Sequence, residues 1–201
     1  MRLDFLADQV SAYLNALPQV QGCRLYGSLK SGAFDKYSDI DLEVDVSGMD
    51  NGQFALEIPA LLSQRFPVVF FDFAPSLAPE KYIVSAAVDP ENPFGIIDLS
   101  CAANPHCRTV SREELSRRND PYSHILKLFV INLKHFIRRA DCRRDMERMY
   151  RKVFPASGPA LRQTEMLLDV YRWLRENAGE KQEAYVRALE PYVKEAAPFD
   201  H

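Results

Sequence analysis

The stretch LYGSLKSGAFDKYSDIDLEVDV, residues 25–46, contains two predicted strands joined by a turn-rich connection. In the second strand, apolar and acidic residues alternate over positions 38–46, which predicts one buried face and one polar face. The apolar positions are Ile40, Leu42, Val44 and Val46, and the acidic positions are Asp39, Asp41, Glu43 and Asp45. Four acids on one face repel one another, so the burial of any pair requires a nearby cation.

Two interpretations of this acidic face are open. Charged residues commonly protect an exposed strand edge, and the alternation alone is compatible with that role. Two aspartates at positions i and i+2 also project side by side and can both bind a hard cation such as Mg²⁺. A pair of such ions about 3.5–4 Å apart, bridged by carboxylates, supports in-line attack at a phosphorus atom. Asp39 and Asp41 are therefore candidate magnesium ligands.

The residues before the acidic strand favour the second interpretation. Gly27 and Ser28 close the first predicted strand, and a glycine there lets the backbone approach a ligand closely. Ser28 and the amide groups that follow it make a concave set of donors suited to phosphate oxygens. The connection KSGAFDKYS, with Gly32 as its flexible point, then returns the chain to the acids. A phosphate-binding turn that faces a carboxylate pair indicates phosphoryl transfer.

The segment GSLKSGAFDKYSDIDLEV resembles the Gly-Ser, glycine and Ser-Asp-x-Asp signature of the DNA polymerase β-like nucleotidyltransferase superfamily. The matching positions are Gly27, Ser28, Gly32, Ser38, Asp39 and Asp41. The resemblance implies a mixed-sheet catalytic domain in which Gly27, Ser28 and Ser38 bind a nucleoside triphosphate such as ATP. It also implies two Mg²⁺ ions, held by Asp39, Asp41 and a third carboxylate on a neighbouring strand.

Two residues are candidates for the third carboxylate. Asp98 lies in FGIIDLSCA and Asp72 in VVFFDFAPS, and each is a lone acid in an apolar strand. An acid that stays buried, charged and unpaired lowers the stability of the fold by several kcal/mol. Aminoglycoside and lincosamide nucleotidyltransferases resemble this sequence most where an apolar-Asp-apolar strand follows a hairpin. That resemblance favours Asp98 as metal ligand and as base for the acceptor hydroxyl, with Asp72 as the open alternative.

The chain divides into an α/β half and a helical half, which predicts an α+β fold. The segment KYIVSAAVDPENPFGIIDLSCA predicts a hairpin, and IPALLSQRF, residues 58–66, predicts a helix with Pro59 in its first turn. From about Glu113 only helical patterns occur, with a break at ASGP, residues 156–159. We therefore expect a catalytic domain over residues 1–110 and a C-terminal helical domain over 111–201. This layout is similar to the helical bundle that small bacterial antibiotic nucleotidyltransferases append to the catalytic domain.

Lys127 and Lys134 lie seven residues apart on one predicted helix, so they share a face. One interpretation is a solvated helix flank. In the resembling families, a lysine on the first helix after the catalytic domain commonly binds the nucleotide triphosphate. Lys127 and Lys134 are therefore candidate nucleotide-binding residues.

Composition limits the location and the partners of the chain. The 201 residues are 47% hydrophobic, and the net charge is −3. No apolar stretch approaches the roughly 20 residues that span a bilayer, and the N-terminus lacks the apolar core of a signal peptide, so no membrane partner is expected. Four scattered cysteines indicate reduced thiols and a cytoplasmic location. The spacing of Cys101, His106 and Cys107 lacks the second ligand pair of a zinc site.

The charge pattern argues against a nucleic-acid partner. The net charge of −3 disfavours a chain-wide polyanion-binding role, although it leaves room for a local basic patch. The basic run over residues 138–152 is interleaved with acids, and mixed charges at i, i+4 spacing are typical of a solvated helix.

The expected function is transfer of a nucleoside monophosphate, AMP from ATP, to a hydroxyl of a small-molecule acceptor, with release of pyrophosphate. The expected acceptor site lies between the two halves. Three alternatives are open: a minimal antitoxin-like enzyme that modifies a protein or an RNA end, a nucleotide-binding module without turnover, and a structural interaction protein with an acidic strand edge. The sequence predicts neither the acceptor, nor the base preference, nor the oligomeric state.

Overall fold

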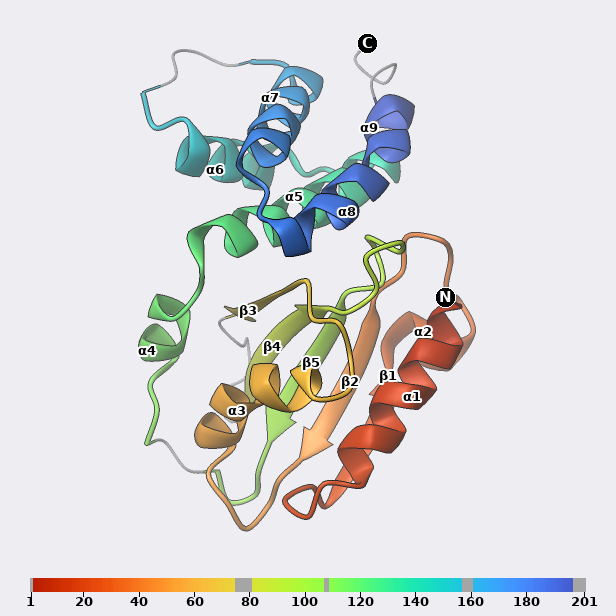
Figure 1. The fold of residues 1–201 in the computed structure, drawn as a ribbon, viewed down its shortest axis with the longest axis vertical. Helices are drawn as coiled ribbons and strands as arrows, with labels where there is room; N and C mark the ends of the chain where they lie inside the picture. The colour runs from red at the N-terminus through yellow and green to blue at the C-terminus, as the bar shows by residue number, and fades with distance from the viewer. Residues whose placement is uncertain (1, 75–80, 107–108, 157–160, 197–201) are drawn as a thin grey trace. The chain divides into compact units, whose positions relative to one another are not determined.

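The structure, a computed structural model, describes residues 2–74, 81–106, 109–156 and 161–196. The chain forms two compact units, Met1–Asn119 and Asp120–His201 (Figure 1). The division lies later in the chain than the boundary expected near residue 110, because α4 (Arg112–Arg117) packs against β3 (Phe70–Ala74). Asn119 joins α4 to this strand: its side chain accepts a hydrogen bond from the Phe73 amide (2.7 Å) and donates one to the Phe73 carbonyl (2.9 Å).

The first unit is built on a five-stranded mixed sheet with the order β1-β2-β5-β4-β3. Its other strands are β1 (Gly22–Tyr26), β2 (Ile40–Asp45), β4 (Lys81–Ala87) and β5 (Ile97–Ala102). Strands β2 and β5 are parallel, whereas the β1–β2, β3–β4 and β4–β5 pairs are antiparallel. The antiparallel β4–β5 pair confirms the predicted hairpin. A mixed sheet followed by helices confirms the predicted α+β fold class.

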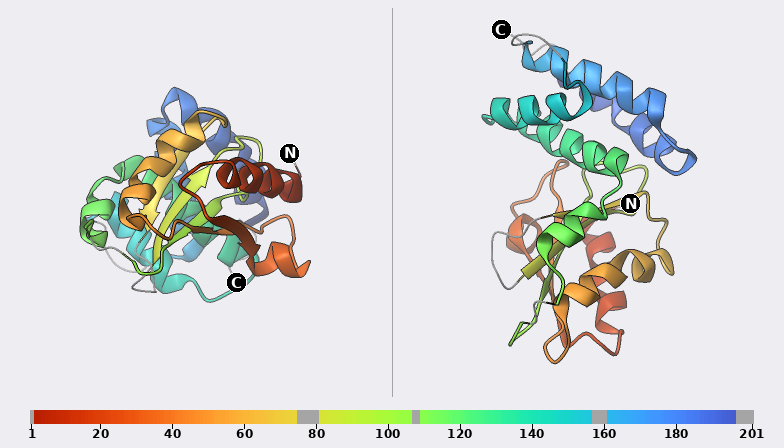
Figure 2. Two further views of the ribbon diagram at one scale, coloured as in Figure 1. Left: turned by 90° about the horizontal axis from the view of Figure 1, so that it is seen from below. Right: turned by 90° about the vertical axis from the view of Figure 1, so that its left-hand side faces the viewer.

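One face of the sheet carries the core of this unit. Ile40, Leu42 and Val44 of β2 are fully buried, as the alternation in the sequence predicts. Helices α1 (Leu3–Asn15) and α3 (Asn51–Ser63) pack on this face (Figures 1 and 2). Burial of apolar side chains between helix and sheet is the main stabilising contribution. It also leaves the acidic face of β2 on the opposite side of the sheet.

Helix α3 begins earlier than the sequence predicts. Asp50 caps it, with its side chain accepting hydrogen bonds from the amides of Gly52 (2.8 Å) and Gln53 (3.1 Å). Pro59 therefore lies inside the helix rather than in its first turn, and that prediction is wrong. Phe54, Ile58 and Leu62 are buried at helical spacing, and their packing outweighs the hydrogen bond that the proline ring removes.

The second unit consists of helices in the part of the chain that the structure describes. They are α5 (Pro121–Ile137), α6 (Arg143–Val153), α7 (Gln163–Asn177), α8 (Glu180–Ala188) and α9 (Glu190–Ala196). Pro121 stands at the start of α5, where its missing amide costs nothing, and the Asp120 side chain caps the helix by accepting a hydrogen bond from the Ser123 amide (2.8 Å). Of the predicted break at 156–159, residues 157–159 lie outside the described residues. Among the described helices, none is both long and apolar enough to cross a bilayer.

Candidate active site

A row of polar side chains crosses the sheet on the face opposite the helical core. In the strand register, Tyr26 pairs with Asp41, Asp41 with Asp98, Asp98 with Ser85, and Ser85 with Asp72. Residues that pair directly on neighbouring strands project from the same face of a sheet. The row therefore brings together residues that are far apart in the sequence, and both candidates for the third carboxylate belong to it.

Asp41 and Asp98 stand directly opposite each other on the parallel strands β2 and β5. Adjacent strands lie about 4.8 Å apart, so the two carboxyl groups can bind the same ion. Asp39 precedes β2 by one residue and, two positions from Asp41, belongs to the same face. All three side chains are half-buried. A set of carboxylate oxygens on adjacent strands is the donor chemistry that Mg²⁺ prefers.

Within the described ranges, no group of three or more His, Cys, Asp or Glu residues is arranged to hold a metal. The fit to a divalent cation consequently rests on the Asp41–Asp98 register and on the oxygen-only donor set, and the assignment of these residues as metal ligands stays a prediction.

Gly27 lies against the carboxylate of Asp41. The chain turns there from β1 into the short helix α2 (Gly27–Ser31), and Gly27 has a positive φ of 69°. A Cβ added at Gly27 would lie 2.1 Å from Asp41 Oδ2, so only glycine fits this approach. The structure thus places the Gly27-Ser28 turn beside the acid pair. The Ser28 hydroxyl has no hydrogen-bond partner among the residues that the structure describes.

Replacing Gly27 by alanine tests whether the close approach of this residue to Asp41 is needed for binding of Mg²⁺ and ATP. Gly32 supplies a matched control, because its φ is also positive (75°) but an added Cβ would meet no atom within 4 Å. Both Gly27→Ala and Gly32→Ala should lower the free energy of unfolding by about 1–2 kcal/mol through the left-handed conformation. Only Gly27→Ala should also displace Asp41 and remove the added stabilisation by Mg²⁺ and ATP, measured by thermal unfolding. If both variants kept that stabilisation equally, the proposed binding of Mg²⁺ and ATP beside Gly27 and Asp41 would be contradicted.

Ser85 and Tyr26 are residues of the row that sequence reasoning missed. The Ser85 hydroxyl donates a hydrogen bond to Asp98 Oδ1, which orients the carboxyl group, and Ser85 itself is buried. The Tyr26 hydroxyl lies 3.0 Å from the Ser100 hydroxyl of β5. Burial raises the pKa of Tyr26, and the neighbouring Asp41 and Asp98 carboxylates raise it further. A serine inside the apolar run KYIVSAAV was a visible signal, but its meaning depends on the β4–β5 register.

Asp72 occupies the far end of the row. It lies on the edge strand β3 and is only 1% exposed. In the strand order, β5 and β4 stand between β3 and β2, so Asp72 is separated from Asp41 by two intervening strands. Three strand spacings amount to about 14 Å, too far for two carboxylates to share one metal ion. The register therefore supports Asp98 over Asp72 as the third carboxylate.

The remaining acids of β2 have other partners. Glu43 forms ion pairs with Arg24 of β1 and with Lys81 of β4. Burial alone would raise the pKa of Glu43, but the Lys81 ammonium and the Arg24 guanidinium together hold it below its usual value. Asp45 is exposed and accepts a hydrogen bond from the Ser47 amide (2.8 Å). Of the acids of β2, Glu43 is therefore neutralised by two cations, whereas Asp45 lies at the exposed end of the strand.

Ser38 is placed in the loop before β2. It is 4% exposed; its hydroxyl accepts a hydrogen bond from the Asp35 amide (3.0 Å) and donates one to Asp35 Oδ1 (3.1 Å). These hydrogen bonds hold the loop that leads to Asp39 in its conformation. Contact between Ser38 and a nucleotide stays a prediction.

The two predicted lysines belong to α5 in the second unit. Lys127 is buried and Lys134 is half-buried. Their binding of a triphosphate stays a prediction. Of the cysteines near the hairpin, Cys101 is fully buried, and burial raises its pKa to about 12, which disfavours a thiolate ligand. Cys107 lies outside the described residues.

Comparison with known proteins identifies a distant structural likeness. No protein-family model and no curated protein matches the chain. Among solved structures, the chain is similar to a mutant of the Cid1 poly(U) polymerase bound to MgATP, at 18% identity and a TM-score of 0.36. The match covers 82% of this chain and 46% of that chain, so this chain spans less than half of the solved protein. At this identity and TM-score, the likeness assigns neither a family nor an activity to the chain.

Proposed function

We propose that this chain is a metal-dependent nucleotidyltransferase that moves AMP from ATP to a hydroxyl group of a small-molecule acceptor and releases pyrophosphate. The observation that carries the proposal is the parallel register that sets Asp98 directly opposite Asp41. The close approach of Gly27 to the Asp41 carboxylate supports it, because the turn proposed to bind phosphate then lies beside the acid pair.

The proposed reaction forms one bond and breaks one. The acceptor oxygen attacks the α-phosphorus, the bond from that phosphorus to the bridging oxygen breaks, and the pyrophosphate leaves with the electron pair. Asp98, oriented by Ser85, accepts the proton of the acceptor hydroxyl. Divalent cations held by Asp39, Asp41 and Asp98 would supply charge neutralisation at the phosphate oxygens.

The remaining residues are proposed to position the substrates. The backbone of Gly27 and the hydroxyl of Ser28 bind the β- and γ-phosphates beside Asp41, and Ser38 holds the loop that leads to Asp39. Lys127 and Lys134 neutralise the triphosphate from α5. A small-molecule acceptor is favoured by the layout of a sheet unit followed by a short helical unit, which the resemblance to antibiotic nucleotidyltransferases suggested.

The test combines ligand binding with product analysis. The protein is incubated with ATP labelled at the α-phosphate, Mg²⁺ and hydroxyl-bearing small molecules that include aminoglycosides and lincosamides. We expect acceptor-dependent release of pyrophosphate, transfer of label to the small molecule, and loss of both on chelation of the metal. Repeating the assay with the other three ribonucleoside triphosphates measures the base preference.

Two outcomes would contradict the proposal. Label that appears in RNA or in a protein instead would favour a minimal nucleotidyltransferase that acts on macromolecular ends. If calorimetry detects no binding of ATP and Mg²⁺, a non-enzymatic interaction protein with an acidic strand edge would explain the sequence better.

A further inference from the structure

The second unit carries a local basic surface on a chain that is acidic as a whole. Residues 138–152 include seven basic and three acidic residues, a net charge of +4, whereas the full chain has a net charge of −3. The helix α6 contains five of the basic residues. The sequence pattern alone suggested that their charges are paired along the helix, so the ion pairs decide whether this surface is neutral.

The described ion pairs leave much of the positive charge of α6 uncompensated. Arg143 pairs with Glu147 (3.0 Å) and Arg148 pairs loosely with Asp145 (3.3 Å), and all four of these side chains are substantially exposed. The other basic residues of the helix, Arg144, Arg151 and Lys152, form no ion pair with any residue that the structure describes.

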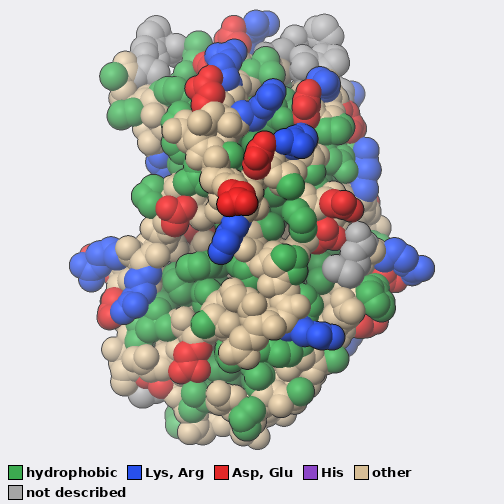
Figure 3. All heavy atoms as spheres, in the orientation of Figure 1, with side chains coloured by type: hydrophobic (Ala, Val, Ile, Leu, Met, Phe, Trp, Pro, Cys, Tyr) green, Lys and Arg blue, Asp and Glu red, His purple; other side chains and the backbone are tan. Residues whose placement is uncertain are grey.

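The helices α7, α8 and α9 differ from α6 in their ion pairs. Their described ion pairs are Arg162–Glu165, Arg172–Asp169, Arg187–Glu183 and Lys194–Glu190, with distances of 3.0, 3.3, 2.7 and 2.7 Å. In Figure 3, acidic and basic side chains alternate over the region that Figure 1 assigns to α7, α8 and α9. In contrast to α6, the helices α7, α8 and α9 therefore carry no excess of positive charge.

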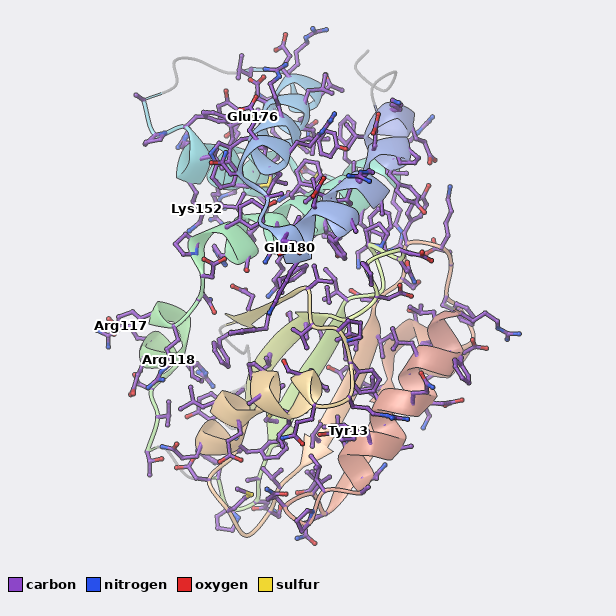
Figure 4. All side chains as sticks on the ribbon, viewed as in Figure 1. Tyr13, Arg117, Arg118, Lys152, Glu176 and Glu180 are labelled. Carbon is purple, nitrogen blue, oxygen red and sulfur yellow. The ribbon has the colours of Figure 1, made fainter. Side chains whose placement is uncertain are left out.

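Three exposed arginines, two of them without a described ion pair, lie along one stripe of the helix. Arg144, Arg148 and Arg151 are spaced i, i+4 and i+7, which puts them within about 60° of one another around the helix axis and along about 10 Å of its length. All three are exposed, and Lys152, labelled in Figure 4, is a further exposed cation next to Arg151. Like charges at this spacing repel each other, so the stripe does not stabilise the helix.

We propose that this stripe (Arg144, Arg148 and Arg151) binds the phosphodiester backbone of a single-stranded nucleic acid. A guanidinium group matches a phosphate with two parallel hydrogen bonds, and the stripe is made of arginine rather than lysine. A linear row of cations fits a linear row of phosphates. Asp145 and Glu147 flank the row on either side of the helix and would repel the second strand of a duplex.

Two other anionic partners fit the surface less well. Insertion into a membrane surface requires exposed apolar residues, but Met146, Met149 and Tyr150 are buried where α6 packs against α5 and α7. A stable protein interface has an apolar or aromatic centre, and the exposed face of α6 carries none. Phosphate contacts alone suffice for binding of a nucleic-acid strand.

Fluorescence anisotropy with labelled single strands of about 12 nucleotides tests the proposal on the full chain. The test variant is Arg144→Gln with Arg148→Gln and Arg151→Gln. The matched control is Arg172→Gln with Arg175→Gln and Arg187→Gln, which removes the same charge from exposed positions of α7 and α8. Glutamine keeps a high helix propensity, and circular dichroism and thermal unfolding verify that both variants fold.

The test variant should raise the Kd for the strand at least about tenfold at about 50 mM salt, and it should reduce the slope of log K against log salt by about 2. The control should leave the Kd within about twofold of the unmodified chain, because its three arginines lie outside the stripe. RNA and DNA strands should bind equally, since the contacts are to phosphate, and a duplex should bind more weakly.

Three results would overturn the proposal. The first is absence of strand binding by the unmodified chain. The second is an equal loss in both triple variants, which would indicate a net-charge effect. The third is loss of binding to phosphatidylserine vesicles, but not to strands, in the test variant, which would identify a membrane surface as the partner. Because the stripe lies in the second unit, each of these outcomes is independent of the proposed transferase activity.

Discussion

Replacing Asp39 and Asp41 together by asparagine is expected to abolish nucleotidyl transfer and the stabilisation of the chain by Mg²⁺ and ATP. Asparagine keeps the size of the side chain but removes the negative charge that a hard cation requires. Loss of the electrostatic contribution of the ions at the transferring phosphate should lower turnover by on the order of 10³-fold or more. In the unmodified chain, ligand at 100 times its Kd stabilises the fold by about 2.7 kcal/mol, and the double variant should show none of this.

Thermal unfolding with Mg²⁺, with a non-hydrolysable ATP analogue, and with both together measures the effect. The unmodified chain should gain more from the two ligands combined than from either alone. Asp45→Asn is the matched control, because Asp45 is on the same strand, is exposed, and does not belong to the row that contains Asp98. Equal ligand stabilisation of the double variant and the control would rule out the metal assignment.

Replacing Asp98 by asparagine is expected to lower kcat by about 10²–10⁴-fold with little change in stability. The register places Asp98 opposite Asp41, and Ser85 orients its carboxyl group. An asparagine can still accept the hydrogen bond from Ser85, but it cannot take the proton of the acceptor, which is the contribution of a general base. The expected loss therefore appears in turnover, while the midpoint of thermal unfolding stays near that of the unmodified chain.

Asp72→Asn is the matched comparison. Asp72 lies in the same row, but on β3, which β5 and β4 separate from β2. We expect this variant to change stability, since Asp72 is buried, and to keep kcat within about tenfold of the unmodified chain. A well-folded Asp72→Asn variant without activity, beside an active Asp98→Asn variant, would reverse the assignment of the third carboxylate.

Local patterns in the sequence predicted most of the elements. The alternation over 38–46 predicted β2, and its apolar residues are buried. The helical periodicity after Glu113 predicted the helices that follow, and DPENPFG predicted the β4–β5 hairpin. These predictions succeeded because periodicity and turn chemistry are properties of neighbouring residues. The start of α3 failed for the complementary reason: the buried contacts of Phe54 and Ile58 kept Pro59 inside a longer helix.

By itself, the sequence determined the acidic strand, the glycine turn before it and the order of sheet and helices, because each of these depends on residues close together in the chain. Only the tertiary structure decided which acids meet. Asp98 stands opposite Asp41 because β2 and β5 pair in parallel, across more than fifty residues of intervening chain, and that hydrogen-bonded register cannot be read from either strand alone. The same holds for charge. Glu43 and Asp41 look alike in the sequence, but Arg24 and Lys81 from two other strands neutralise Glu43, whereas Asp41 faces Asp98.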